Sequence, residues 1–178
     1  MPRKSNVILK DVEILPGGFR NFSGSPTPFN KDGGKRYFNI RLDEDLAKKF
    51  IDEGFSGIRD ANAKRDDRDP LWIMNVAVRF EPVPCHIWIY STVGNNRRLM
   101  RESNVSMLDW MDIETADIEI RPSWWENNGR NGYKPYCANL FITPVENELT
   151  TKYGNVPIVS DDDDDDMNRE SDPDDTPF

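Results

Sequence analysis

Residues 35–42 read KRYFNIRL, a stretch in which two kinds of side chain alternate. The apolar set is Phe38, Ile40 and Leu42, and the set between them is Lys35, Tyr37, Asn39 and Arg41. Strict alternation is typical of a β-strand with one buried and one exposed face. The stretch therefore predicts a strand that directs its aromatic and polar side chains outward.

A helix is expected directly after this strand. Asp43 fits an N-cap, and apolar residues follow at helical spacing up to Ile51. Gly54 is placed to end the helix.

The rest of the chain predicts mostly strands. Apolar or alternating segments occur at 6–15, 71–80, 85–92, 116–121 and 133–143. A turn at 127–132 joins the last two into a hairpin, and 105–113 suits a short helix. The expected fold is mainly β, a small antiparallel barrel of five or six strands with one or two short helices. Trp72 and Trp110 are expected in its core.

Charge is distributed unevenly along the chain. The net charge is −9, and residues 161–178 carry ten acidic side chains and one arginine. The remainder has 22 basic and 22 acidic side chains, and its first 41 residues hold eight Lys or Arg against three acids. A locally basic face can bind phosphates even when the total charge is negative.

Two regions are predicted from this composition. Residues 1–150 form the folded domain, and 151–178 form a linker and a disordered acidic tail that is too poor in apolar residues to pack. The N-terminus lacks a secretory apolar stretch and no run is long enough to span a membrane, so a cytoplasmic location is expected.

The residues that usually carry catalysis are scarce. His86 is the only histidine, and Cys85 and Cys137 are expected to be intracellular thiols. No metal, no cofactor and no enzymatic activity are predicted. Asp117, Glu119 and Arg121 lack the lysine of a nuclease motif, and the Gly pairs lack the spacing of a phosphate-binding loop.

The chain ends Asp174-Asp175-Thr176-Pro177-Phe178. A terminal aromatic beside a free carboxylate can fill a small pocket with a basic rim, so this end is expected to bind partner proteins. The alternative is a tail that only keeps the protein soluble.

This ending resembles the tip of bacterial and phage single-stranded DNA-binding proteins, which usually finish Asp-Asp-Asp-Ile-Pro-Phe. It departs from that pattern at Pro173 and Thr176. The body is similar to the phage members of this class in four segments: GGKRYFNI at 33–40, ADIEIRP at 116–122, NGRNGYK at 128–134 and LFIT at 140–143.

The resemblance implies an OB fold, sequence-tolerant binding of single strands, and a tail that recruits replication, recombination and repair proteins such as a helicase, primase, polymerase, recombinase or nuclease. If the chain is phage-encoded, it would act in the bacterial host cytoplasm. The tetramer of the bacterial protein is not implied.

Single-strand binding needs cations for phosphates and aromatic rings for bases. Candidates lie on four segments of the sequence: the strand from 35 (Lys35, Tyr37, Asn39, Arg41), the strand from 85 (Trp88, Tyr90), the hairpin (Trp124, Trp125, Arg130, Tyr133, Lys134) and the early loop (Phe19, Arg20, Phe22). The opposite phase, with Trp88 buried, is also compatible with the sequence.

Two other functions stay open. An acidic adaptor or DNA mimic would bind proteins and no nucleic acid, although a mimic would spread its acids over the folded surface. A strand-annealing mediator would differ from a passive binder only after binding.

Overall fold

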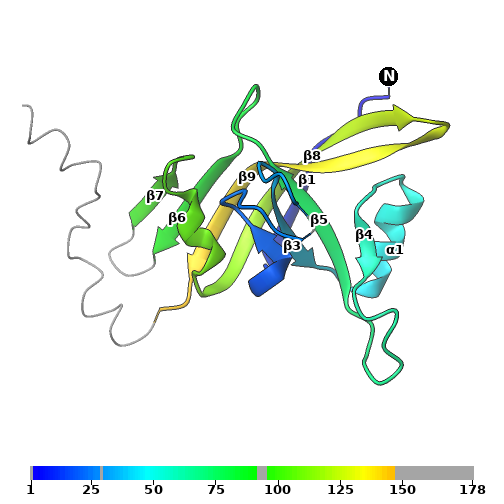
Figure 1. Cartoon of the computed structure of the whole chain (residues 1–178), viewed down its shortest axis with the longest axis horizontal. Helices are drawn as coiled ribbons and strands as arrows, with labels where there is room; N and C mark the ends of the chain where they lie inside the picture. The colour runs from blue at the N-terminus through cyan, green and yellow to red at the C-terminus, as the bar shows by residue number, and fades with distance from the viewer. Residues whose placement is uncertain (1, 29, 92–95, 147–178) are drawn as a thin grey trace, which may run out of the picture. The chain divides into compact units, whose positions relative to one another are not determined.

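The computed structural model describes residues 2–28, 30–91 and 96–146. Strands dominate these residues, with one α-helix and two 3₁₀ turns (Figure 1). In chain order the elements are β1 (Val7–Val12), η1 (Gly17–Phe19), β2 (Arg20–Asn21), β3 (Arg36–Arg41), α1 (Glu44–Asp52), β4 (Ile58–Asp60), β5 (Trp72–Val78), β6 (His86–Ser91), β7 (Asn96–Met100), η2 (Val105–Asp109), β8 (Ile113–Asn127) and β9 (Arg130–Pro144). The prediction of a mainly β chain with short helices is confirmed.

The sheet is mixed, so the predicted antiparallel barrel is only partly right, although most of the strand pairs are antiparallel. Its main path runs β1-β8-β9-β5-β3-β2 and is open at both ends rather than closed into a barrel. β9 is parallel to β5 where Ala77 faces Tyr136, and parallel to β6 along residues 86–89. The nine strands of the described residues also exceed the expected five or six. Alternation within a strand identifies its faces but says nothing about the direction of its neighbours.

The N-terminal segment pairs with β8 along β1 and then continues beside β3. Asp11 has a positive φ of 53°, and the register of β1 against β8 shifts there. Beyond this point the N–H of Leu15 donates to the carbonyl of Asn39 at 3.0 Å, and the N–H of Arg41 donates to the carbonyl of Glu13 at 3.0 Å. Residues 13–15 therefore lie beside β3.

One face of the sheet packs into a single apolar core. Its fully buried side chains include Phe22, Phe38, Ile40, Met74, Val76, Ile87, Leu108, Ile118, Ile120, Leu140 and Ile142. Phe22 and Phe38 stack with ring centroids 5.1 Å apart. Full burial of each such side chain contributes about 1.5–3 kcal/mol, so this face fixes which side of every strand points outward.

Helix α1 forms as its sequence predicts. A carboxylate oxygen of Asp43 accepts the N–H of Leu46 at 2.8 Å, which satisfies one of the unpaired donors of the first turn. Ala47 and Phe50 are buried against the sheet. Gly54 has a φ of 91° and takes the left-handed conformation that ends the helix.

β8 and β9 form the long hairpin that Figure 1 shows in yellow-green and yellow. Their turn holds Asn128 and Gly129, both with positive φ, which suits a two-residue type I′ connection. This confirms the predicted turn. The hairpin also reaches the residues after α1, because Phe55 forms a bridge with Tyr133.

Trp110 lies at the surface, so its predicted place in the core is wrong. It is 89% exposed and directly follows η2. In a turn with three residues per repeat, Val105 and Leu108 align on one side and are both buried, while Trp110 falls on another. Trp72 is half-buried against the core.

Cys85 and Cys137 are free thiols, as expected, and both are buried. Burial raises the pKa of the Cys137 thiol well above its ordinary value. Within the described part of the chain, no helix has the length and apolar character of a membrane span. The tail and the end of the predicted domain, from residue 147 onward, lie outside the described residues.

Candidate nucleic-acid interface

A row of four residues crosses the outer face of the sheet. Tyr37 of β3 lies opposite Ala77 of β5, and Ala77 lies opposite Tyr136 of β9. Tyr136 in turn lies opposite Arg121 of β8. Side chains in register on neighbouring strands share a face. We call these four residues the outer row, in which only the methyl group of Ala77 stands between two tyrosines.

Three cations surround the ring of Tyr136. The guanidinium carbon of Arg79 is 5.0 Å from the ring centroid, the amine of Lys134 is 5.3 Å away and the guanidinium carbon of Arg121 is 6.0 Å away. None of the three forms an ion pair with a carboxylate of the described residues. An aromatic ring with unpaired cations around it matches the needs of a single strand, a surface to stack on and charge for phosphates.

The predicted outer face of β3 is only partly right. Lys35 is exposed and Tyr37 is half-buried on the outer face. Asn39 is buried, because η1 covers it and its side-chain amide donates to the carbonyl of Phe19 at 2.8 Å. Asn39 therefore anchors the loop that covers it.

The early loop also departs from the prediction. Phe22 is completely buried in the core. Arg20 is 7% exposed, and its guanidinium donates to the carbonyls of Ile14, Leu15, Leu108 and Met111. Burial lowers the pKa of Arg20, and Asp109 and Asp112 oppose that shift. Phe19 remains half-buried.

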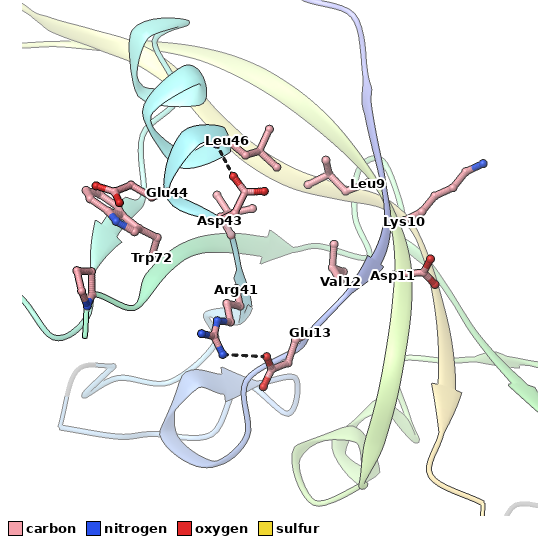
Figure 2. Close-up of a pocket in the computed structure, with 12 residues that line it drawn as sticks. Leu9, Lys10, Asp11, Val12, Glu13, Arg41, Asp43, Glu44, Leu46 and Trp72 are labelled. Atoms are coloured by element: carbon pink, nitrogen blue, oxygen red, sulfur yellow. Dashed lines mark hydrogen bonds and ion pairs between the residues drawn. The ribbon is translucent and has the colours of Figure 1, made fainter. Parts of the chain in front are cut away.

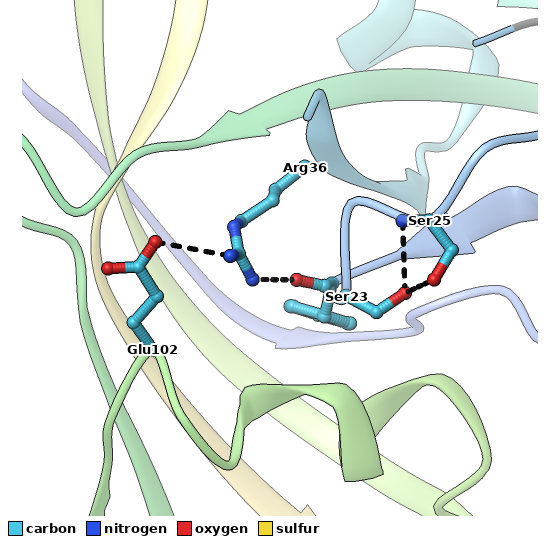
Figure 3. Close-up of polar contacts among 5 residues, drawn as sticks. Ser23, Ser25, Arg36 and Glu102 are labelled. Atoms are coloured by element: carbon cyan, nitrogen blue, oxygen red, sulfur yellow. Dashed lines mark hydrogen bonds and ion pairs between the residues drawn. The ribbon is translucent and has the colours of Figure 1, made fainter. Parts of the chain in front are cut away.

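Arg36 fixes the same loop to the sheet. Figure 3 shows its guanidinium between the carbonyl of Phe22, at 2.8 Å, and the carboxylate of Glu102, at 3.2 Å. The hydroxyls of Ser23 and Ser25 lie 2.8 Å apart in the adjoining turn. Arg36 is thus engaged within the protein.

Arg41 lies apart from the outer row, at the rim of a hollow lined by β1, β3 and the start of α1 (Figure 2). Its guanidinium is 3.6 Å from the carboxylate of Glu13. Asp43 and Glu44 line the same hollow. Arg41 is therefore paired with a carboxylate and lies away from the outer row.

The side chains of strand β6 alternate as predicted, with the isoleucine inward and the aromatic residues outward. Ile87 is buried, Trp88 is half-buried and Tyr90 is 39% exposed. The guanidinium carbon of Arg97, on β7, is 4.9 Å from the centroid of the Trp88 ring. Trp88 also lies opposite Phe141 of β9, which is 41% exposed.

The hairpin tryptophans are both half-buried. Trp124 contacts Tyr133 edge-on with ring centroids 5.2 Å apart, on the side of the hairpin that faces Phe55. The indole N–H of Trp125 donates to the hydroxyl of Ser56 at 3.3 Å. Trp125 therefore connects the hairpin to the segment after α1, Trp124 packs within the hairpin, and Arg130 is exposed at its tip.

One acidic side chain, Glu119, lies on the outer face between the outer row and β6. Glu119 accepts hydrogen bonds from the side-chain amides of Asn6, at 3.0 Å, and Asn139, at 2.6 Å. These bonds lower the pKa of Glu119. Glu119 therefore adds a negative charge to the middle of this face at neutral pH.

The sequence prediction missed Tyr136, Arg79 and Arg121. Tyr136 is two residues from Lys134, so the alternation of that strand could have placed it on the same face. Its contact with Arg79 depends on the parallel pairing of β5 with β9, which alternation does not reveal.

In the ranges that the structure covers, no group of three or more His, Cys, Asp or Glu side chains is arranged to hold a metal ion.

Comparisons with known proteins agree on one class. A family model described as "Putative phage ssDNA-binding domain" matches residues 1–178. No curated protein matches the sequence.

Solved structures of the single-stranded DNA-binding protein from bacteriophage Enc34 are similar in fold. Its C-terminal truncation is 13% identical, with a TM-score of 0.51 over 80% of this chain and 87% of that one. The same protein in complex with ssDNA is 12% identical, with a TM-score of 0.51 over 80% and 88%.

Proposed function

This chain belongs to the phage ssDNA-binding domain family, and from that premise we propose that it binds single-stranded DNA, with little sequence preference, at the outer row. The observation that carries the proposal is the ring of Tyr136 with Arg79, Lys134 and Arg121 around it. Every base has a π-face, so stacking on Tyr136 tolerates any sequence while the cations bind phosphates. The proposed activity is binding without catalysis.

We propose that the sheet corresponds to an OB-type arrangement, which is consistent with binding at the outer row. In OB folds, the second and third strands and two loops beside them bind oligonucleotides. We relate β3 and β5 to those strands, the segment 16–35 to the first loop and the β8–β9 turn to the second. The hydrogen bonds of residues 13–15 to β3 support this relation, because they bring the β1 end of the strand path back to β3.

Three further residues extend the same face. Lys35 and Tyr37 lie at the β3 side of the outer row, and Arg130 lies at the hairpin tip. We include these three in the proposed interface. Trp124, Trp125 and Tyr133 stay candidates for contacts at the hairpin.

The tail gives the protein a second role in our proposal. Residues 174–178 would recruit replication, recombination or repair proteins in the host cytoplasm, where the bound strand is protected. The acidic residues from 161 would also compete with DNA for the cations around Tyr136. Deleting 161–178 should therefore raise affinity at low salt and have little effect at high salt, and an unchanged affinity at low salt would rule out this competition.

The direct test is a titration of the full chain with fluorescent oligo-dT, an RNA of equal length and duplex DNA at two salt concentrations. We expect tight binding of oligo-dT that weakens with salt, and weak binding of the duplex. A chain that binds no oligo-dT, with or without residues 161–178, would leave a protein-binding adaptor as the better explanation.

A further inference from the structure

A pocket of about 330 Å³ lies on the outer face beyond Glu119, at the end of β9 away from Tyr136. Its side chains come from strands that are in register there. Asp117 of β8 lies opposite Phe141, and Thr115 lies opposite Thr143. On the other side, Tyr90 of β6 lies opposite Arg97 of β7. The volume suits a small ring system.

The lining of this pocket holds two aromatic residues, one cation, Arg97, and two acidic residues, Asp11 and Asp117. Phe141 and Tyr90 are 41% and 39% exposed. An exposed ring such as that of Phe141 offers an apolar surface on which a ligand can stack. Arg97 is positioned by its contact with Trp88, and it adds one positive charge at the rim. Flat aromatic bases and their phosphates match the rings and the cation.

Asp117 supplies a hydrogen-bond acceptor that is held in place. The backbone N–H of Asp11, at the irregular end of β1, donates to one of its carboxylate oxygens at 2.9 Å. The other oxygen has no partner among the described residues. Glu119 differs, because Asn6 and Asn139 occupy both of its oxygens. Of these two acids, only Asp117 has a carboxylate oxygen that accepts no hydrogen bond from the described residues.

We propose that this pocket is a second subsite for single-stranded DNA that prefers a base with an exocyclic amine, cytosine foremost. The base would stack on Phe141 and Tyr90, Arg97 would bind its phosphate, and Asp117 would accept a hydrogen bond from the amine. Thymine presents a carbonyl oxygen where cytosine has its amine, and a carboxylate repels that oxygen. The inference rests on the proposed function, and it adds a mild base preference at one position.

The test compares the affinity of the full chain for oligo-dC and oligo-dT of equal length, in the wild type and in Asp117→Asn. We expect the ratio of the two affinities to favour oligo-dC in the wild type and to fall about fivefold in Asp117→Asn, the low end for a side chain–base contact. Glu114→Gln is the matched control, since it removes the same charge from an exposed position of β8 outside the pocket.

The outcomes separate this inference from the proposed function. If oligo-dT binds tightly but the ratio is the same in the wild type, Asp117→Asn and Glu114→Gln, the second subsite is wrong and the outer row stands. If Phe141→Ala leaves both affinities unchanged, the stacking surface is also wrong. A failure to bind either oligonucleotide would instead overturn the proposed function.

Discussion

The early loop and the outer row contain the same kinds of side chain and use them in opposite ways. In the loop, Arg20 is buried and donates to four backbone carbonyls, and Phe22 is completely buried. In the outer row, Arg121 has no carboxylate partner among the described residues and lies beside the ring of Tyr136. Arginine and an aromatic residue thus stabilise the fold in one place and, in our proposal, form a binding surface in the other.

The difference comes from the backbone around each residue. Strands that pair on both sides satisfy their own N–H and C=O groups, so cations beside them remain available. The loop and η2 leave carbonyls unpaired, and a buried guanidinium satisfies several of them at once. Arginine and aromatic residues in a loop therefore indicate DNA binding only if the arginine is not needed to satisfy unpaired backbone carbonyls of that loop.

The largest effect is expected from Arg20→Ala. Four carbonyls would lose a donor, and the free energy of unfolding should fall by about 3 kcal/mol. Urea denaturation measures this change, and Arg59→Ala on the exposed side of β4 is the control. The affinity of the folded fraction for oligo-dT should not change. A loss of affinity without a loss of stability would place Arg20 in the interface after all.

The next effect concerns Tyr136→Ala. Removing a stacking ring should weaken oligo-dT binding about tenfold, since each stacked base contributes about 1–3 kcal/mol. The measurement is fluorescence anisotropy, with thermal unfolding to verify the fold. Trp110→Ala is a useful comparison, because that ring is more exposed and has no cation near its face among the described residues. Equal losses in the two variants would contradict a specific role for Tyr136.

A smaller effect is expected from Arg79→Gln and Lys134→Gln, made singly. Each should reduce the slope of log affinity against log salt by about 0.7, the value for one phosphate contact on a single strand. Titrations at four salt concentrations give the slope. Arg59→Gln should leave it unchanged, and an equal reduction there would indicate a diffuse charge effect.

The smallest effect is the pH dependence that Glu119 provides. Hydrogen bonds from Asn6 and Asn139 lower the pKa of Glu119 in the folded state. The ionised carboxylate therefore stabilises the fold at pH values above its pKa in the unfolded chain. This stabilisation is lost as the pH falls through the folded-state pKa. Asn6→Ala should therefore lower stability slightly at pH 7, by under about 0.5 kcal/mol, and much less near pH 3. If Asn6→Ala lowered the free energy of unfolding more near pH 3 than at pH 7, the expected pH dependence would be wrong.

The sequence predicted the strand from 35, the capped helix and the hairpin because each depends on local alternation, capping or turn residues. It did not predict the parallel contacts of β9, since strand direction depends on crossovers. Tyr37 lies on the outer face as predicted, whereas Asn39 and Phe22 are buried by a loop whose path depends on tertiary hydrogen bonds. The resemblance to phage single-stranded DNA-binding proteins is confirmed by the family match.

Photocrosslinking tests the central claim most directly. The full chain would be irradiated with oligo-dT that carries 5-iododeoxyuridine, and the modified peptides would be identified by mass spectrometry. The outer row predicts crosslinks at Tyr136 and Tyr37, competed by unlabelled oligo-dT. Crosslinks confined to Trp110 or to the early loop, with none at Tyr136 or Tyr37, would contradict the claim that the outer row binds the bases.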